Sequence, residues 1–175
     1  MPKHSFESQL SGGHPNSLGN TLAVVDAVLA DQARFEELFM CYASTDEVVR
    51  LRTSNAVKRV CMEEPLWLIA YIDRLIDCVA TIDQASTQWT LAKLFQLLQA
   101  HMSPEQYQRA LKLLKDNLSK HEDWIVLNNT METLGEWAGS DRSIKKWLLP
   151  QLQRLSGDRR KSVAKRAHKL LTTFE

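Results

Sequence analysis

Residues 46–60 read DEVVRLRTSNAVKRV. At the turn of about 100° per residue of an α-helix, one face of this stretch carries Val49, Thr53, Ala56, Val57 and Val60, all of them small or β-branched. A helix that packs on one flat partner would normally use Leu or Phe at these positions. The small side chains therefore predict a helix that neighbours approach closely from several sides.

Helical patterns continue along most of the chain. Thr45 or Asp46 is the expected N-cap of the quoted helix, Pro65 opens the next one, and Ser103 with Gln106 forms a capping box. No alternating Val- or Ile-rich run bounded by turn residues occurs, so the sequence predicts an all-α protein. The expected helices cover residues 20–30, 31–43, 46–60, 65–79, 83–100, 103–118, 122–138, 141–156 and 158–173.

The composition indicates one globular domain. The chain has 175 residues, of which 44% are hydrophobic, and no apolar run is long enough to span a membrane or to form a signal peptide. Residues 1–19 are rich in Ser, Gly, Pro and Asn and are expected to form a flexible arm that docks locally, followed by a single domain over 20–175. Cys41, Cys61 and Cys78 lack CxxC spacing and lie in apolar patterns, which favours reduced, buried thiols and a cytoplasmic location.

The helical pattern also repeats within the chain. A shift of 77 residues places Asp46, Val49, Thr53, Ala56, Val57 and Val60 on Asp123, Val126, Thr130, Thr133, Leu134 and Trp137. The same rhythm recurs at Val163, Ala167, Leu170 and Leu171. Recurrence of helix pairs at about 40 residues is typical of a solenoid.

Near the end of the chain, Pro150 precedes Asp158 by eight residues and Val163 by thirteen. This spacing, together with Val49 and Arg50 after Asp46, resembles the HEAT repeat, a pair of antiparallel helices. The resemblance implies a right-handed α-α superhelix of about four HEAT-like pairs over residues 32–175, with the helix at 20–30 as an N-terminal cap. It also implies that Asp46 and Arg50 are structural residues between repeats.

The sequence offers little catalytic chemistry. The five His residues show no HxxxH or HExxH spacing, no glycine-rich phosphate loop follows a strand, and Asp73 and Asp77 are expected on a solvated helix face. We therefore expect no metal, no cofactor and no enzymatic activity. Most of the five Trp residues are expected in the core, with Trp67 and Trp124 partly exposed.

Charge is unevenly distributed. Residues 142–175 contain ten Lys and Arg residues and two acidic residues, although the whole chain has a net charge of only +1. On the last predicted helix, Lys161, Lys165 and Lys169 form one outward row at four-residue spacing, flanked by Arg159 and Arg166. The row is either a binding site for an anionic partner or the polar cap that a terminal repeat requires.

The sequence leaves two candidate functions from different classes. The first is a scaffold without enzymatic activity that binds a protein partner on the concave surface lined by the second helix of each pair. The alternative is nucleic-acid binding, and HEAT-like DNA glycosylases share the implied architecture. The residues expected to contact an anionic partner are Arg159, Arg160, Lys161, Lys165, Arg166 and Lys169, joined by Arg52 and Arg59 if the basic surface continues across a groove.

Overall fold

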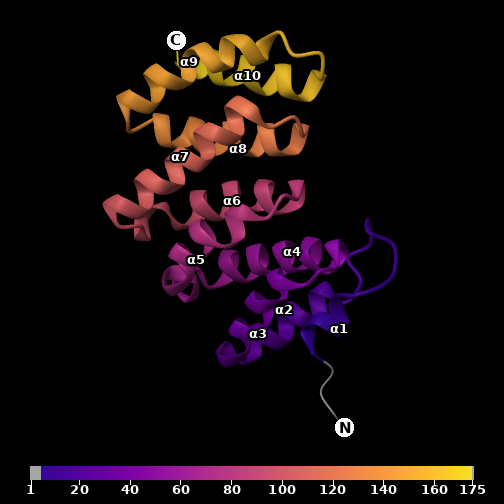
Figure 1. The fold of residues 1–175 in the computed structure, drawn as a ribbon. Helices are drawn as coiled ribbons and strands as arrows, with labels where there is room; N and C mark the ends of the chain where they lie inside the picture. The colour runs from indigo at the N-terminus through magenta and orange to yellow at the C-terminus, as the bar shows by residue number, and fades with distance from the viewer. Residues whose placement is uncertain (1–4, 175) are drawn as a thin grey trace. The chain divides into compact units, whose positions relative to one another are not determined.

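The computed structural model describes residues 5–174, and Figure 1 shows its helices. No β-strand occurs within these residues, so the all-α prediction is confirmed. The chain divides into two compact units, unit 1 (Met1–Thr90) and unit 2 (Leu91–Glu175). The boundary falls inside the stretch that the sequence assigns to one domain, and helix α6 (Ala85–Leu98) crosses it.

Unit 1 alternates α-helices with short 3-10 helices. Helix α4 is the longest element of the unit, and α1, α2 and α3 pack against it together with two of the 3-10 segments. The elements are α1 (Phe6–Leu10), α2 (Thr21–Ala30), η1 (Gln32–Arg34), α3 (Phe35–Met40), η2 (Cys41–Ala43), α4 (Glu47–Glu63), η3 (Pro65–Tyr71), α5 (Ile72–Asp77) and η4 (Val79–Thr81).

Helix α4 carries the small stripe of the quoted sequence. Asp46 is its N-cap, and its side chain accepts a hydrogen bond of 2.8 Å from the backbone N–H of Val48. Thr53 and Ala56 are fully buried. Since α4 has neighbours on several sides, these small side chains allow the close approach that the sequence predicts.

The segment after α4 differs from the expected single helix over 65–79. Pro65 begins the 3-10 helix η3, in which Leu68 is buried while Ile69, expected in the core, is 39% exposed. A 3-10 helix turns every three residues, so an apolar pattern with α-helical spacing cannot keep all its members inward. Cys78, at the C-cap of α5, is exposed, in contrast to the expected buried thiol.

Residues 5–19 dock locally, as the sequence predicts for this arm, but they contain a short helix, α1, that was not predicted. The side chain of Ser5 caps α1 by accepting from the backbone N–H of Ser8 at 3.2 Å, and Phe6 and Leu10 are fully buried. The guanidinium of Arg34 lies 3.9 Å from the centre of the Phe6 ring. Residues 1–4 of the expected arm lie outside the described part of the chain.

Unit 2 consists of antiparallel helix pairs. Tyr107, near the start of α7, stacks on Trp137, near the end of α8, with 4.7 Å between ring centroids. The ammonium of Lys145, near the start of α9, donates to the carbonyl of Phe174 at the end of α10. After the C-terminal part of α6, the elements are η5 (Gln99–His101), α7 (Pro104–Lys120), α8 (Trp124–Ala138), α9 (Arg142–Ser156) and α10 (Lys161–Phe174).

Two helix starts in unit 2 follow the sequence closely. The capping box at the start of α7 is confirmed, because the side chains and backbones of Ser103 and Gln106 exchange hydrogen bonds of 3.0 and 3.1 Å. The side chain of Asp123 caps α8 by accepting from two backbone N–H groups. Asp46 and Asp123, which the internal repeat superposes, therefore have the same role in α4 and α8.

The internal repeat also fixes which helix face is buried. Of the six superposed pairs, the five that follow the N-cap pair Asp46 and Asp123 are buried in both α4 and α8. In α10, Val163 and Ala167 are buried as predicted, whereas Leu170 and Leu171 are only partly covered. The burial pattern predicted from the sequence therefore holds for α4 and α8 and for the first half of α10.

Candidate binding surfaces

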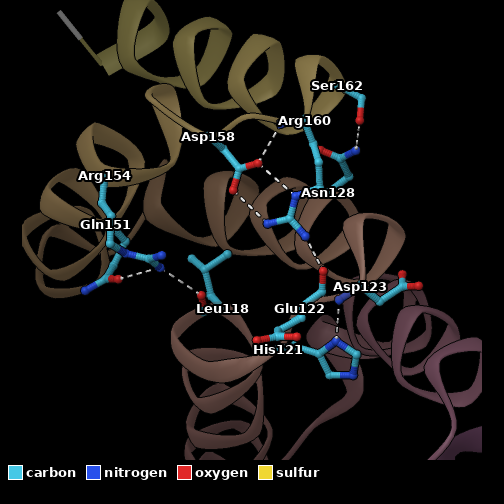
Figure 2. Close-up of polar contacts among 10 residues, drawn as sticks. All are labelled: Leu118, His121, Glu122, Asp123, Asn128, Gln151, Arg154, Asp158, Arg160 and Ser162. Atoms are coloured by element: carbon cyan, nitrogen blue, oxygen red, sulfur yellow. Dashed lines mark hydrogen bonds and ion pairs between the residues drawn. The ribbon is translucent and has the colours of Figure 1, made fainter.

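Helices α8 and α10 lie parallel within unit 2. The side-chain amide of Asn128 lies 3.3 Å from the hydroxyl of Ser162 (Figure 2), and Arg166 forms an ion pair of 2.9 Å with Glu132. Both contacts join residues 34 positions apart. This constant offset keeps the outward face of α8 beside the outward face of α10.

The C-terminal part of α6 continues this layer. The hydroxyl of Thr133 donates to the carbonyl of Ala92 at 2.8 Å, and the amide of Gln96 donates to the carboxylate of Glu136. Residues 91–98 of α6 thus lie next to α8 on the side away from α10. Together the three segments form a continuous surface of side chains, which we call the second-helix surface.

Lys161, Lys165 and Lys169 form an exposed row on α10, which we call the α10 ridge. All three side chains are exposed, as predicted, and so is that of Arg159. Val163 and Ala167, on the opposite side of the helix, are fully buried. Like charges at four-residue spacing repel each other by a few tenths of a kcal/mol per pair, so the ridge slightly destabilises its own helix.

Arg160 has a structural role in place of the predicted binding role. Its guanidinium forms an ion pair of 2.7 Å with Asp158 and also donates to the backbone carbonyl of Glu122 (Figure 2). Arg160 therefore connects the turn before α10 to the turn before α8. Figure 2 shows a second arginine that connects two elements by a hydrogen bond to a backbone carbonyl: Arg154 of α9 donates to the carbonyl of Leu118 in α7 at 3.1 Å.

Asp158 is the acidic partner in this turn. The hydrogen bond from the Arg160 side chain, followed by that from its backbone N–H, lowers the pKa of Asp158 from 3.8 to about 2. Because the pKa is lowered in the folded state, the carboxylate stabilises the fold fully above pH 4, and this contribution disappears as the pH falls from about 4 to about 2.

We therefore expect Asp158→Asn to lower the melting temperature by about 2–4 °C at pH 7, which corresponds to about 1 kcal/mol in a chain of this size. The difference from wild type should shrink as the pH approaches 2. Calorimetric melting curves between pH 7 and pH 2 measure it. Asp116→Asn, which removes an exposed ion pair with Lys120, should change the melting temperature little at any pH. An Asp158→Asn effect that does not depend on pH would contradict this account.

Arg52 does not belong to an exposed basic surface, whereas Arg59 stays partly accessible. Arg52 is only 2% exposed, so it is not available to an anionic partner. Arg59 is half-buried and donates to the side chain of Asn55 on the same helix at 2.7 Å. The prediction that Arg52 contacts an anionic partner is therefore wrong. That contact would have favoured nucleic acid as the partner.

The guanidinium of Arg52 instead binds the segment between α1 and α2. It donates to five backbone carbonyls, and its shortest hydrogen bonds, of 2.6 and 2.7 Å, go to Gly12 and Leu10. The segment bends around the side chain with positive φ angles at Gly12, Gly13 and Gly19. At Gly19 a Cβ atom would lie 2.8 Å from the Arg52 guanidinium carbon, so a side chain there would collide with Arg52.

Arg50 is structural, as the repeat resemblance implied. Its guanidinium donates to the carbonyl of Ser44 at 2.7 Å and to the side chain of Gln84 at 2.8 Å. The amide of Gln84 in turn donates to the carbonyl of Glu47 at the start of α4. These bonds join the N-terminal end of α4 to the segment that leads into α6.

The described residues contain few candidates for catalysis. Across residues 5–174 no group of three His, Cys, Asp or Glu side chains could hold a metal ion. Burial raises the pKa of the Cys41 thiol to about 11 and that of Cys61 to about 12, so both stay protonated and weakly nucleophilic near pH 7. Asp73 and Asp77 are exposed, as predicted.

Tryptophan exposure follows the sequence prediction only in part, because Trp89 and Trp147, expected in the core, are partly exposed. Trp124 is 50% exposed, Trp67 is partly exposed, and Trp137 is fully buried.

Within residues 5–174 no helix is both long enough and apolar enough to cross a membrane. We compared the chain with protein-family models, with curated proteins and with solved structures, and none of them matches it.

Proposed function

We propose that this chain is a HEAT-like helical-repeat scaffold without enzymatic activity, which binds a protein partner on the surface lined by its second helices. The observation that supports this most is the parallel register of α6, α8 and α10 in unit 2. A layer of parallel helices offers an extended surface of side chains, and repeat proteins generally use such surfaces to bind other proteins.

The charges on this surface suit a protein partner. Glu132 of α8 pairs with Arg166 of α10, and Glu136 of α8 accepts a hydrogen bond from Gln96 of α6, so the layer carries acidic groups as well as the lysines of α10. Protein interfaces use such mixed patterns to select a partner and to fix its orientation. A continuous polyanion would meet the carboxylates of α8 as well as the lysines of α10.

Affinity capture with three forms of the full chain tests this proposal. The forms are the wild type, a second-helix variant (Lys165→Glu with Lys169→Glu) and a first-helix variant of equal charge change at two exposed residues (Lys120→Glu with Arg142→Glu). We expect mass spectrometry to identify a protein that the wild type and the first-helix variant retain and that the second-helix variant loses. Equal loss from both variants, or reproducible hydrolase or glycosylase activity of the purified chain, would contradict the proposal.

Nucleic-acid binding is the second candidate, because the α10 ridge with Arg159 leaves four basic side chains exposed. If the three ridge lysines contact phosphates, the logarithm of the binding constant should fall with the logarithm of salt concentration with a slope of about −3. Fluorescence anisotropy with labelled duplex and single-stranded DNA and RNA measures this slope. Binding should vanish when Lys161, Lys165 and Lys169 are all changed to Glu, whereas absence of binding by the wild type at low salt would remove this candidate.

A further inference from the structure

A groove runs between α7 and α9, which form the first-helix layer of unit 2. The two helices are parallel, since Lys115 lies beside Trp147 and the carbonyl of Leu118 accepts a hydrogen bond from Arg154. The groove has a volume of about 390 Å³ and is lined by Gln108, Lys112, Lys115, Asp116, Ser119 and Trp147, with Leu111 between them. This volume is within the range of about 300–1,000 Å³ that is usual for ligand sites.

Helices α7 and α9, which border the groove, have a larger net positive charge than α8 and α10. Helices α7 and α9 together hold eight Lys and Arg residues and two acidic ones, whereas α8 and α10 hold four and two. Lys112 and Lys115 of α7 line the groove, and Lys112 is exposed. The first-helix layer of unit 2 therefore has a larger net positive charge than the second-helix layer, and positively charged surfaces attract ligands of the opposite sign.

We propose that the groove between α7 and α9 binds an acidic peptide segment of a partner protein. The carboxylates of such a segment would pair with Lys112 and Lys115, and an apolar side chain would pack against Leu111 and the part of the Trp147 indole that Lys115 does not cover. The lining supports both parts, because it combines lysines with an indole and an aliphatic floor. The site lies on the opposite helix layer from the second-helix surface, so it adds a binding surface to the proposed function and does not depend on it.

Two features of the groove favour a peptide over single-stranded nucleic acid. The ammonium of Lys115 lies 5.0 Å from the centre of the Trp147 ring, so this cation covers the face on which a base would stack. The carboxylate of Asp116 is part of the lining, where it would repel phosphates but could accept a hydrogen bond from a peptide N–H. The lysines near the groove are also point charges without the planar fork with which arginine binds phosphate.

Fluorescence anisotropy of a labelled acidic peptide tests the proposal. The peptide has about ten aspartate and glutamate residues around one central phenylalanine, and the full chain is titrated into it at several salt concentrations. We expect a dissociation constant on the order of 10 μM at low salt. Lys112→Glu with Lys115→Glu should weaken binding at least about tenfold, whereas Lys161→Glu with Lys165→Glu, which changes the net charge by the same amount, should weaken it less than about twofold.

Trp147→Leu provides a second test that does not change charge. It should weaken binding of the phenylalanine-containing peptide several-fold and leave binding of a peptide with glycine in its place unchanged, and circular dichroism checks that each variant is folded. Equal weakening by the two double variants would show attraction by net charge alone and would overturn the proposal. A labelled oligothymidylate that binds more tightly than the peptide, and whose binding depends on Lys112 and Lys115, would assign the groove to nucleic acid and would overturn the proposal too.

Discussion

We expect the Arg52→Ala variant to unfold with a free energy about 3–5 kcal/mol below that of the wild type. The guanidinium is almost fully buried and donates to five backbone carbonyls of residues 10–17. Removing it leaves the Leu10 carbonyl, whose hydrogen bond to Arg52 is buried, without a donor, and takes the donor from four further carbonyls at partly buried positions. A buried group left without a partner costs about 1–3 kcal/mol, and the buried side chain also loses its packing. Since whole domains are stable by only about 5–15 kcal/mol, this is a large fraction of the total.

Urea unfolding followed by circular dichroism measures the loss, and limited proteolysis between residues 11 and 19 reports whether the segment is released. Arg59→Ala is the matched control, because Arg59 lies two turns further along α4 and its hydrogen bond reaches only Asn55 of the same helix. We expect that variant to lose less than about 1 kcal/mol. Arg52→Lys keeps the charge but has three donors on one atom, so it should recover only part of the stability. An Arg52→Ala variant as stable and as protease-resistant as the wild type would show that these bonds contribute nothing.

The second large effect is expected for Trp137→Ala. Trp137 is fully buried near the end of α8, where its ring stacks on Tyr107 of α7. Truncation removes a large apolar side chain and leaves a cavity, which typically costs about 3–5 kcal/mol when a buried Trp or Phe becomes Ala. The loss should appear in urea unfolding as a lower midpoint for unit 2.

The same helix provides the control. Trp124, at the start of α8, undergoes the same chemical change in Trp124→Ala but is half exposed, so we expect a loss of less than about 1 kcal/mol. If the two variants lose the same stability, burial is not what distinguishes the two tryptophans. Tyr107→Phe separates ring stacking from the hydroxyl group, because it keeps the ring that packs on Trp137 and should stay close to the wild type.

Local signals in the sequence predicted much of the fold. The N-caps Asp46, Ser103 and Asp123 all occupy the expected positions, because a cap depends on residues only two or three positions away. The buried stripes of α4 and α8 were also predictable, since helical periodicity shows directly which face is apolar. The 3-10 helix at Pro65–Tyr71 was not, because the α- and 3-10 periods differ too little to be separated over two turns.

The candidate binding residues were harder to predict. Arg52 lies three residues after Val49 and four before Ala56, so its place on the buried stripe was the one available signal that it is not at the surface. Its partners are main-chain carbonyls at least 35 residues away, and sequence patterns do not encode such pairings. Arg160 and Arg166 were predicted to bind an anionic partner, although they contact Glu122 and Glu132 within the chain. The sequence could not show these contacts, because the positions of Glu122 and Glu132 relative to α10 depend on tertiary packing.

The groove between α7 and α9 was also missed, because its lining comes from two helices. Lys112 and Lys115 on α7 and Trp147 on α9 are unremarkable in each helix alone. They lie around one groove only because the two helices are parallel neighbours. The α10 ridge, by contrast, lies on a single helix, which is why its exposure could be predicted.

The contacts of Arg52 have a consequence for how this protein can evolve. Every hydrogen bond that Arg52 makes to residues 10–17 ends on a carbonyl oxygen, and none ends on a side chain. Substitutions at Ser11, His14 or Ser17 therefore leave the acceptors in place, whereas Gly12, Gly13 and Gly19 are constrained by their positive φ angles. Natural selection can thus vary the chemistry of this segment while its path stays fixed by one arginine and three glycines.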